Sequence, residues 1–286
     1  MRLAYAQLAL SMILVGINVA VAKVLAESLS VPVILALRCG IAALALAPFI
    51  AWRWPPRPAM LNLFLQSLFG TVCYNAALLA GIRRTGALEA GLVLAALPAA
   101  VGLGAWAVLR EPMPARRAMA ALLAACGMAV LAWSRASAGG GNLVGGLFLA
   151  LAVCAEASYA LLAKANSGRL GVLEATFWMQ LFGGLVMAPL AWGSAMPEWS
   201  QLPILTFHAL TTGVGAVVLW YAGLRRVPGG VAGIFTSLLP LTAGLCAVLW
   251  LGEPLTLGYG AAGAVMLLSI GLATWPSARP PIFTSH

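Results

Sequence analysis

Residues 109–112 read LREP and residues 251–254 read LGEP. In both places a long apolar stretch ends on a glutamate that is followed by proline. Proline has no N–H and disfavours helical conformation in the residue before it, so each glutamate is predicted to mark the end of a helix. The recurrence of one unusual joint indicates that the chain contains an internal repeat.

The halves align without a gap when the sequence is shifted by 142 residues. Glu111 and Pro112 then meet Glu253 and Pro254. Alanine, leucine and glycine coincide easily by chance in such segments, whereas the rarer arginine, proline and tryptophan do not. We therefore predict two repeats, residues 1–138 and 139–286, with AGGG at 138–141 at the boundary. The further matching pairs are Gly81 and Gly223, Arg83 and Arg225, Arg84 and Arg226, Pro98 and Pro240, and Trp133 and Trp275.

The composition places the chain in a lipid bilayer. Of its 286 residues, 63% are hydrophobic and 8% are charged, and the mean hydropathy is +1.00. A soluble globular protein of this length carries roughly a quarter charged residues. The first apolar run, Leu3 to Ala22, is long enough to span, and we expect a membrane helix there rather than a cleaved signal peptide.

Ten stretches are apolar and long enough to be transmembrane helices, since a spanning helix needs about 20 such residues. Each repeat would hold five of them. An odd number inverts the second copy, so the predicted fold is an all-α integral membrane protein of two inverted five-helix repeats. Secondary transporters commonly have this architecture, with substrate sites near the midplane. The predicted spans are 3–24, 31–52, 59–80, 87–109, 115–134, 143–163, 172–193, 203–222, 230–252 and 256–275.

The basic residues predict the orientation. If the N-terminus is cytoplasmic, eleven of the 16 Lys and Arg residues lie on the inside and four on the outside, while Arg38 lies within a span. This bias favours both termini in the cytoplasm. The charges are dispersed over short loops, so no nucleic-acid partner is expected. All five cysteines fall within predicted spans without a C-x-x-C motif, and no metal or disulfide framework is suggested.

With its five-plus-five repeat, mid-helix prolines and closing Glu-Pro joint, the chain resembles the drug/metabolite transporter superfamily, EamA type. The most specific stretches are 229–273, which begins GGVAGIFTSLLPLTAG, and its counterpart at 88–131. The resemblance covers nearly the whole chain and is similar in general character to amino-acid exporters of the bacterial inner membrane, the aromatic amino acid branch included. It implies export of small metabolites and does not fix the substrate.

Polar residues inside the spans are the candidates for substrate binding, because they are costly in lipid and face the bundle interior. Glu156 is the only carboxylate well inside a span, and Tyr159 follows one turn later. The alternatives are a structural carboxylate and interhelical hydrogen bonding. The predicted substrate-binding residues are Asn18, Tyr74, Asn75, Glu156, Tyr159 and Trp220.

Other polar residues invite simpler interpretations. We expect at least one of Trp220 and Tyr221 to belong to an interfacial aromatic belt, and His208 to be a satisfied polar residue. Arg38 is expected near enough to an interface for its charge to reach water. A pair between Arg38 and Glu156 is not expected, because we place them on the order of 10 Å apart along the membrane normal.

The prolines and the Glu-Pro joints have predicted structural roles. Pro98 and Pro240 are expected to be hinges or kinks that leave the carbonyls of Leu94 and Thr236 without helical partners. Those carbonyls could accept a hydrogen bond from substrate or water. Glu111 with Pro112, and Glu253 with Pro254, are predicted joints in which each carboxylate faces the positive N-terminus of the helix that follows it.

The favoured function is export of neutral or aromatic amino acids by alternating access, with lipophilic cations as the rival substrates. A membrane enzyme is a poor fit, because the chain has no aspartate and its two histidines are far apart. A purely structural subunit is disfavoured by the inverted repeat. No P-loop, cofactor or metal site is found, and Glu156 is the one candidate proton carrier. We expect a monomer whose partners are a small-molecule substrate and membrane lipid.

Overall fold

The structure is a computed structural model of the whole chain, and it describes residues 1–82, 84, 93–94, 96–134, 143–251 and 257–275. The described residues are mainly helical and contain no strand. Each of the ten predicted spans contains helix. The membrane helices begin with α1 (Arg2–Ala26), α2 (Val31–Leu46), α3 (Arg57–Ser67), α4 (Tyr74–Ile82), α6 (Leu97–Ala107) and α7 (Ala115–Ser134).

The second half repeats this order. Its helices are α8 (Leu143–Asn166), α9 (Val172–Leu190), α10 (Leu202–His208), α11 (Val217–Leu224), α12 (Gly229–Phe235), α13 (Leu238–Leu251) and α14 (Leu257–Thr274). Among the described residues, seven helical stretches are long and apolar enough to cross a membrane, and shorter apolar helices cover Leu97–Ala107 and Gly260–Thr274. The predicted all-α membrane fold is therefore confirmed. The predicted repeat boundary, residues 138–141, lies outside the described residues.

Prolines set the start of several helices. Proline occupies the first turn of α2, α3, α6 and α10. The N–H groups of a helix's first turn make no hydrogen bond within the helix, so proline, which lacks an N–H, loses nothing there. Its fixed φ also suits a helix. Pro98 accordingly lies in the first turn of α6.

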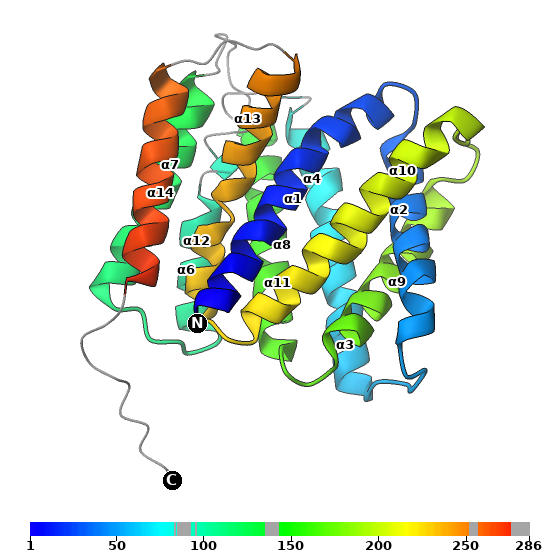
Figure 1. Cartoon of the computed structure of the whole chain (residues 1–286), viewed down its shortest axis with the longest axis horizontal. Helices are drawn as coiled ribbons and strands as arrows, with labels where there is room; N and C mark the ends of the chain where they lie inside the picture. Colours follow the sequence, from blue (N-terminus) through cyan, green and yellow to red (C-terminus); the bar gives the residue numbers. More distant parts are fainter. Residues whose placement is uncertain (83, 85–92, 95, 135–142, 252–256, 276–286) are drawn as a thin grey trace.

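Counterpart helices of the two halves pack against each other. Three helix pairs join equivalent spans: α2 with α9, α6 with α12, and α7 with α14. The other contacts between the halves also come in equivalent pairs. Helix α1 packs on α11 and α13 of the second half, and its counterpart α8 packs on the equivalent helices α4 and α6 of the first half. In Figure 1, α2 and α9 run in opposite directions, as do α7 and α14. This arrangement is what two inverted copies related by a twofold axis produce.

Two π-helical segments occupy equivalent places in the two halves. They are η2 (Leu68–Cys73), between α3 and α4, and η4 (Ala209–Ala216), between α10 and α11. Shifting η2 by 142 residues places it within η4. Single π-turns inside α-helices are frequent at functional sites, because the wider turn loosens the regular hydrogen bonding. The third and eighth spans are thus irregular at the same depth.

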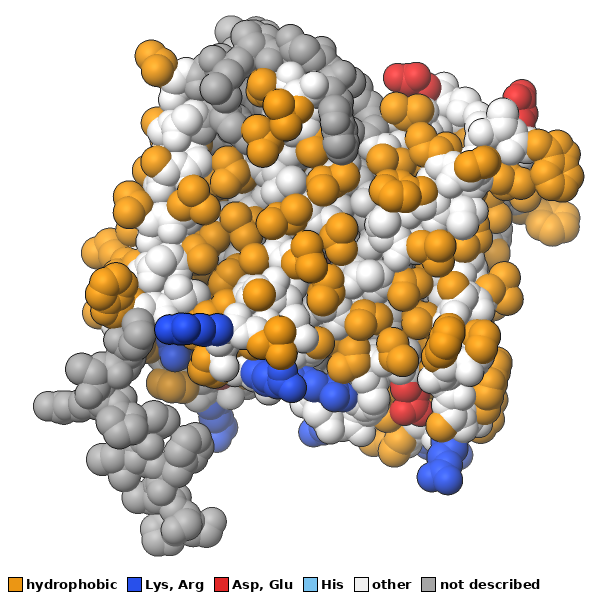
Figure 2. Space-filling model, viewed as in Figure 1, with side chains coloured by type: hydrophobic (Ala, Val, Ile, Leu, Met, Phe, Trp, Pro, Cys, Tyr) orange, Lys and Arg blue, Asp and Glu red, His pale blue; other side chains and the backbone are white. Residues whose placement is uncertain are grey.

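The charged residues are distributed unevenly between the two ends of the bundle. The N-terminus and the last turn of α14 lie at the lower end in Figure 1. Figure 2 shows that Lys and Arg side chains gather along this lower edge, while two acidic groups stand out at the upper edge. Hydrophobic side chains cover the broad belt between the two ends, which is the pattern of a protein surrounded by lipid.

Candidate functional site

Glu156, Tyr159 and Tyr74 lie together in the bundle interior. Glu156 and Tyr159 occupy neighbouring turns of α8, and Tyr74 begins α4, which packs on α8. Tyr159 follows Glu156 by three residues, so the two side chains are neighbours on one face of α8, and all three side chains are half-buried. The structure therefore brings together three of the six residues that the sequence predicts to bind substrate.

Tyr159 also packs directly on the first π-helical segment. A Cβ built on Gly70 would lie 2.9 Å from Cγ of Tyr159 and 3.0 Å from its Cδ2. Only glycine permits this approach of backbone and ring. The position of Tyr159 is therefore determined by the irregular turn of η2.

Asn18 belongs to a second polar cluster, between α1 and the eighth span. Its Oδ1 accepts a hydrogen bond from Thr211 Oγ1 at 3.0 Å and lies 3.1 Å from Nδ1 of His208. Its Nδ2 donates to the carbonyl of Leu14 at 2.9 Å. His208 is a satisfied polar residue, as its sequence context indicates, and Asn18 holds it in place.

Asn75 has a local partner. Its Nδ2 donates to the carbonyl of Thr71 at 2.6 Å, inside η2. This bond supplies a donor where the π-turn disturbs the regular helical ladder, so Asn75 supports the backbone beside Tyr74.

Arg38 lies in the middle of a membrane helix. It is the eighth residue of α2, so it lies about 11 Å along the helix from either end. Its side chain is half-buried, and its Nε is buried without a hydrogen-bond partner. The expectation that its charge reaches an interface stays a prediction. Cys39, the next residue of α2, lies against Gly183 of α9.

Trp220 and Tyr221 are both buried, each with 3% of its surface exposed, so the expectation of an aromatic belt is wrong for both. Nε1 of Trp220 is buried without a hydrogen-bond partner. Tyr221 Oη donates to Oε1 of Gln66, whose Nε2 donates to Asn62 Oδ1 at 2.6 Å. Sequence reasoning missed Gln66, although an amide in the middle of the apolar run LNLFLQSLFG was an available signal.

The ninth span is broken close to Pro240. Helix α12 ends at Phe235 and α13 begins at Leu238, so Thr236 and Ser237 form a turn between them. The hydroxyls of Thr236 and Ser237 donate to the carbonyls of Gly233 and Ile234. The carbonyl of Thr236 accepts the N–H of Leu239 at 3.1 Å. The expectation that this carbonyl lacks a partner is therefore wrong, because the turn supplies one.

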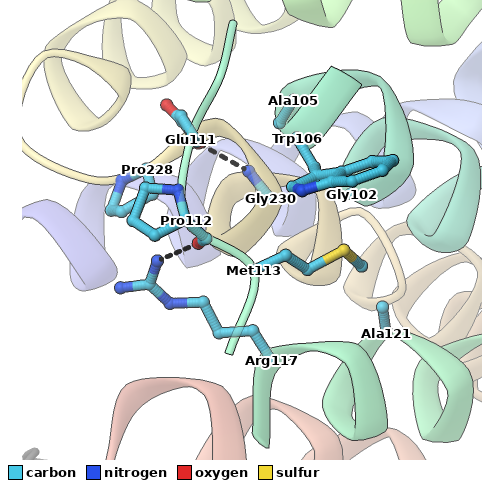
Figure 3. Close-up of a pocket in the computed structure, with 10 residues that line it drawn as sticks. All are labelled: Gly102, Ala105, Trp106, Glu111, Pro112, Met113, Arg117, Ala121, Pro228 and Gly230. Carbon is cyan, nitrogen blue, oxygen red and sulfur yellow. Dashed lines mark hydrogen bonds between the residues drawn. The ribbon is translucent and has the colours of Figure 1, made fainter. Parts of the chain in front are cut away.

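The Glu-Pro joint of the first repeat contacts the second repeat. Glu111 Oε2 accepts a long hydrogen bond, 3.4 Å, from the N–H of Gly230 in the first turn of α12 (Figure 3). The carboxylate does face a helix N-terminus, but the helix is α12 and not the following helix α7, so that part of the prediction is wrong. Glu253 and Pro254 lie outside the described residues.

Lys164 strengthens the same junction. Its Nζ donates to the carbonyls of Leu224, at 2.8 Å, and Val227, and its charge interacts with Glu111. A Cβ on Gly229 would lie 3.3 Å from Cγ of Lys164. Residues of both repeats thus hold the connection between α11 and α12.

Figure 3 shows a small pocket beside this junction, lined by residues of α6, the following joint, α7 and α12. Arg117 crosses it and donates from Nη1 to the carbonyl of Pro112 at 3.1 Å. None of the six predicted substrate-binding residues lines it. The pocket belongs to the joint between the repeats and is separate from the Glu156 cluster.

Comparison with known proteins gives the family. The model of the EamA-like transporter family matches residues 2–133 and again residues 143–275. The chain belongs to the EamA-like transporter family. An uncharacterized transporter of Bacillus subtilis (strain 168), YetK, is 31% identical over 265 residues, which cover 88% of this chain and 80% of that protein. A protein of known crystal structure, 20% identical, superposes with a TM-score of 0.81 over 95% of this chain and 98% of its own.

Family membership makes this EamA-like protein a multi-pass membrane transporter. The enzyme alternative is disfavoured, because both the family and the relative are described as transporters. The two matched ranges are of nearly equal length, one in each half of the chain. The likeness to the solved structure concerns the fold alone, since the identity is low.

Proposed function

We propose that this EamA-family protein exports neutral and aromatic amino acids from the bacterial cytoplasm by alternating access. The observation that carries the proposal is the Glu156 cluster, in which a carboxylate in the middle of α8 shares its helix with Tyr159 and packs beside α4, which begins at Tyr74. Placing a charged carboxylate within the membrane costs free energy, and residues of this kind commonly mark substrate or ion pathways.

The cluster has the groups that an amino acid needs. The carboxylate of Glu156 accepts hydrogen bonds from the substrate ammonium group, and the tyrosine rings contact an aromatic or apolar side chain. The unpartnered indole N–H of Trp220 is a further donor. Asn18 and Asn75 act indirectly in this proposal, because their amides already bind His208 and the η2 backbone.

Paired irregularities support movement between inward-open and outward-open states. The π-segments η2 and η4 weaken the third and eighth spans at matching positions, and the ninth span is broken beside Pro240. Broken helices near the midplane are typical of transporters with inverted repeats. We assign Pro98 and Pro240 as hinges, and residues 1–138 and 139–286 as the two units that move.

The charge distribution supports the orientation. The basic end of the bundle carries the N-terminus and the end of α14 (Figures 1 and 2), and a basic end faces the cytoplasm by the positive-inside rule. We therefore place both termini inside, in the inner membrane, and propose that the protein acts as a monomer in contact with lipid.

The main rival is an exporter of lipophilic cations, which would also use one carboxylate and several aromatic rings. The purified protein in liposomes should be tested with phenylalanine and with phenethylamine, which lacks the carboxylate, in parent and Glu156→Gln forms. We expect the parent to transport phenylalanine and Glu156→Gln to transport it much more slowly. If the amine moves and phenylalanine does not, the substrate class is wrong. Equal phenylalanine flux in both forms would remove Glu156 from the mechanism.

A further inference from the structure

Arg38 has no charged partner in the part of the chain that the structure describes, although it lies in the middle of a membrane helix. Its Nε is buried without a hydrogen-bond partner, and its Nη2 lies 4.0 Å from the thiol sulfur of Cys39, a weak acceptor. A guanidinium is charged at all physiological pH values and offers five donors. Embedded charges are normally paired, because an isolated charge in a low-dielectric interior is costly.

The surroundings of Arg38 do not supply the missing anion. His208 is engaged with Asn18 and brings no negative charge, and Tyr159 is a neutral phenol. Glu156 is the only described carboxylate that lies well inside a span. Gly183 of α9 lies against both Cys39, which follows Arg38, and Ser67, which directly precedes η2. Tyr159, one turn after Glu156, packs on Gly70 of η2, so contacts through α9 and η2 connect the two charged positions.

We propose that Arg38 binds the carboxylate of the transported substrate while Glu156 binds its ammonium group. This inference rests on the proposed function and specifies its substrate class, namely zwitterions that carry both charges close together. A guanidinium fork matches a carboxylate in a bidentate geometry. The substrate then supplies the anion that Arg38 lacks and the cation that Glu156 lacks.

The same arrangement disfavours lipophilic cations. A substrate with only a positive charge satisfies Glu156, but it leaves Arg38 without an anion and brings a second positive charge into the same interior, where repulsion is stronger than in water. An anionic substrate without an ammonium group is disfavoured less, because a buried carboxyl group can take up a proton whereas a guanidinium cannot lose one. Such an anion should bind more weakly than the zwitterion but at the same place. Arg38 is therefore the residue that selects amino acids over their decarboxylated amines.

The test compares Arg38→Gln, Arg38→Lys and the parent protein in liposomes, with phenylalanine and phenethylamine as substrates. Replacing the guanidinium with an amide should lower phenylalanine flux by about tenfold or more, because charge-assisted hydrogen bonds are lost. Phenethylamine flux should stay unchanged or rise. Arg38→Lys should recover part of the phenylalanine flux, since it keeps the charge. Unchanged phenylalanine flux in Arg38→Gln, or an equal fall for both substrates, would overturn the assignment.

A binding measurement keeps the test independent of transport and of variant folding. In the detergent-solubilised parent, 3-phenylpropanoate, which has the carboxylate alone, should compete with phenylalanine in calorimetric titration. The absence of competition in the parent would overturn the role of Arg38 without any variant. If the parent binds phenylalanine but does not transport it, the proposed export fails while the Arg38 assignment stands. If phenylalanine is transported and 3-phenylpropanoate does not compete, the reverse holds.

Discussion

Gly70 provides a sensitive test of the Glu156 cluster, because it is where the first π-segment touches Tyr159. A methyl group added there would lie 2.9 Å from Cγ, 3.0 Å from Cδ2 and 3.3 Å from Cβ of Tyr159. These atoms are at the base of the side chain, so a simple rotation does not remove the overlap. Overpacking of this kind costs about 1–3 kcal/mol. Against this cost, replacing glycine by alanine within a helix by itself stabilises the folded state by about 0.5–1 kcal/mol.

Gly40 is the matched control, since a Cβ at that position meets nothing within 4 Å. It lies in α2, so Gly40→Ala makes the same chemical change without the overlap. The free energy of unfolding, measured in mixed detergent micelles, should be about 1–3 kcal/mol lower for Gly70→Ala than for Gly40→Ala, the size of the overpacking cost. Phenylalanine flux per folded molecule should fall by about tenfold or more in Gly70→Ala only, because small displacements of a positioning group have large kinetic effects.

A double variant separates the cause. Tyr159→Ala removes Cγ and the ring, so the stability cost of Gly70→Ala should shrink by about 1 kcal/mol or more in that background. If Gly70→Ala and Gly40→Ala behave alike in both stability and flux, the packing of Tyr159 on η2 is refuted. If Gly70→Ala is unstable but transports normally per folded molecule, Tyr159 packs as described and has no role in transport.

Three further predictions test the topology, the hinges and the joint. A single cysteine beside Arg84 should be labelled from outside intact cells and one beside Arg226 should not; equal labelling of both would contradict the inverted repeat. Pro98→Ala and Pro240→Ala should each slow transport more than they reduce protein yield, since alanine favours continuous helix across the break; unchanged rates would leave the prolines as ordinary kinks. Arg110 has a left-handed backbone, φ +55°, so Arg110→Gly should raise the free energy of unfolding by about 1 kcal/mol, and a loss of stability would show that its side chain matters more than its backbone.

The helices and their inverted arrangement could be predicted because each depends on local or periodic information. Span length follows from runs of apolar residues, and the inversion follows from an odd number of spans per repeat. The partner of Glu111 could not be predicted in this way. Its bond to Gly230 joins residues of different repeats, and local helix electrostatics indicates that some N-terminus is nearby but not which one.

The candidate site was predictable in part for the same reason. Glu156 and Tyr159 share a helix, so their proximity follows from helical spacing. The direction of Arg38 depends on which face of α2 turns inward, and a helix that is apolar on all sides gives little indication of that face. The role of Gln66 could not be predicted, because it depends on a hydrogen bond to Tyr221, which lies 155 residues away in the sequence.

The packing of α1 on α11 and α13 has a consequence for biogenesis. The first helix leaves the ribosome more than 200 residues before all of α13 has been made. At bacterial rates of synthesis this interval is on the order of ten seconds or more. During that time α1 sits in the membrane with its partner surfaces covered only by lipid or by an insertase. A chain truncated between the repeats would keep those surfaces uncovered, so quality-control proteases in the membrane should recognise it as unfinished.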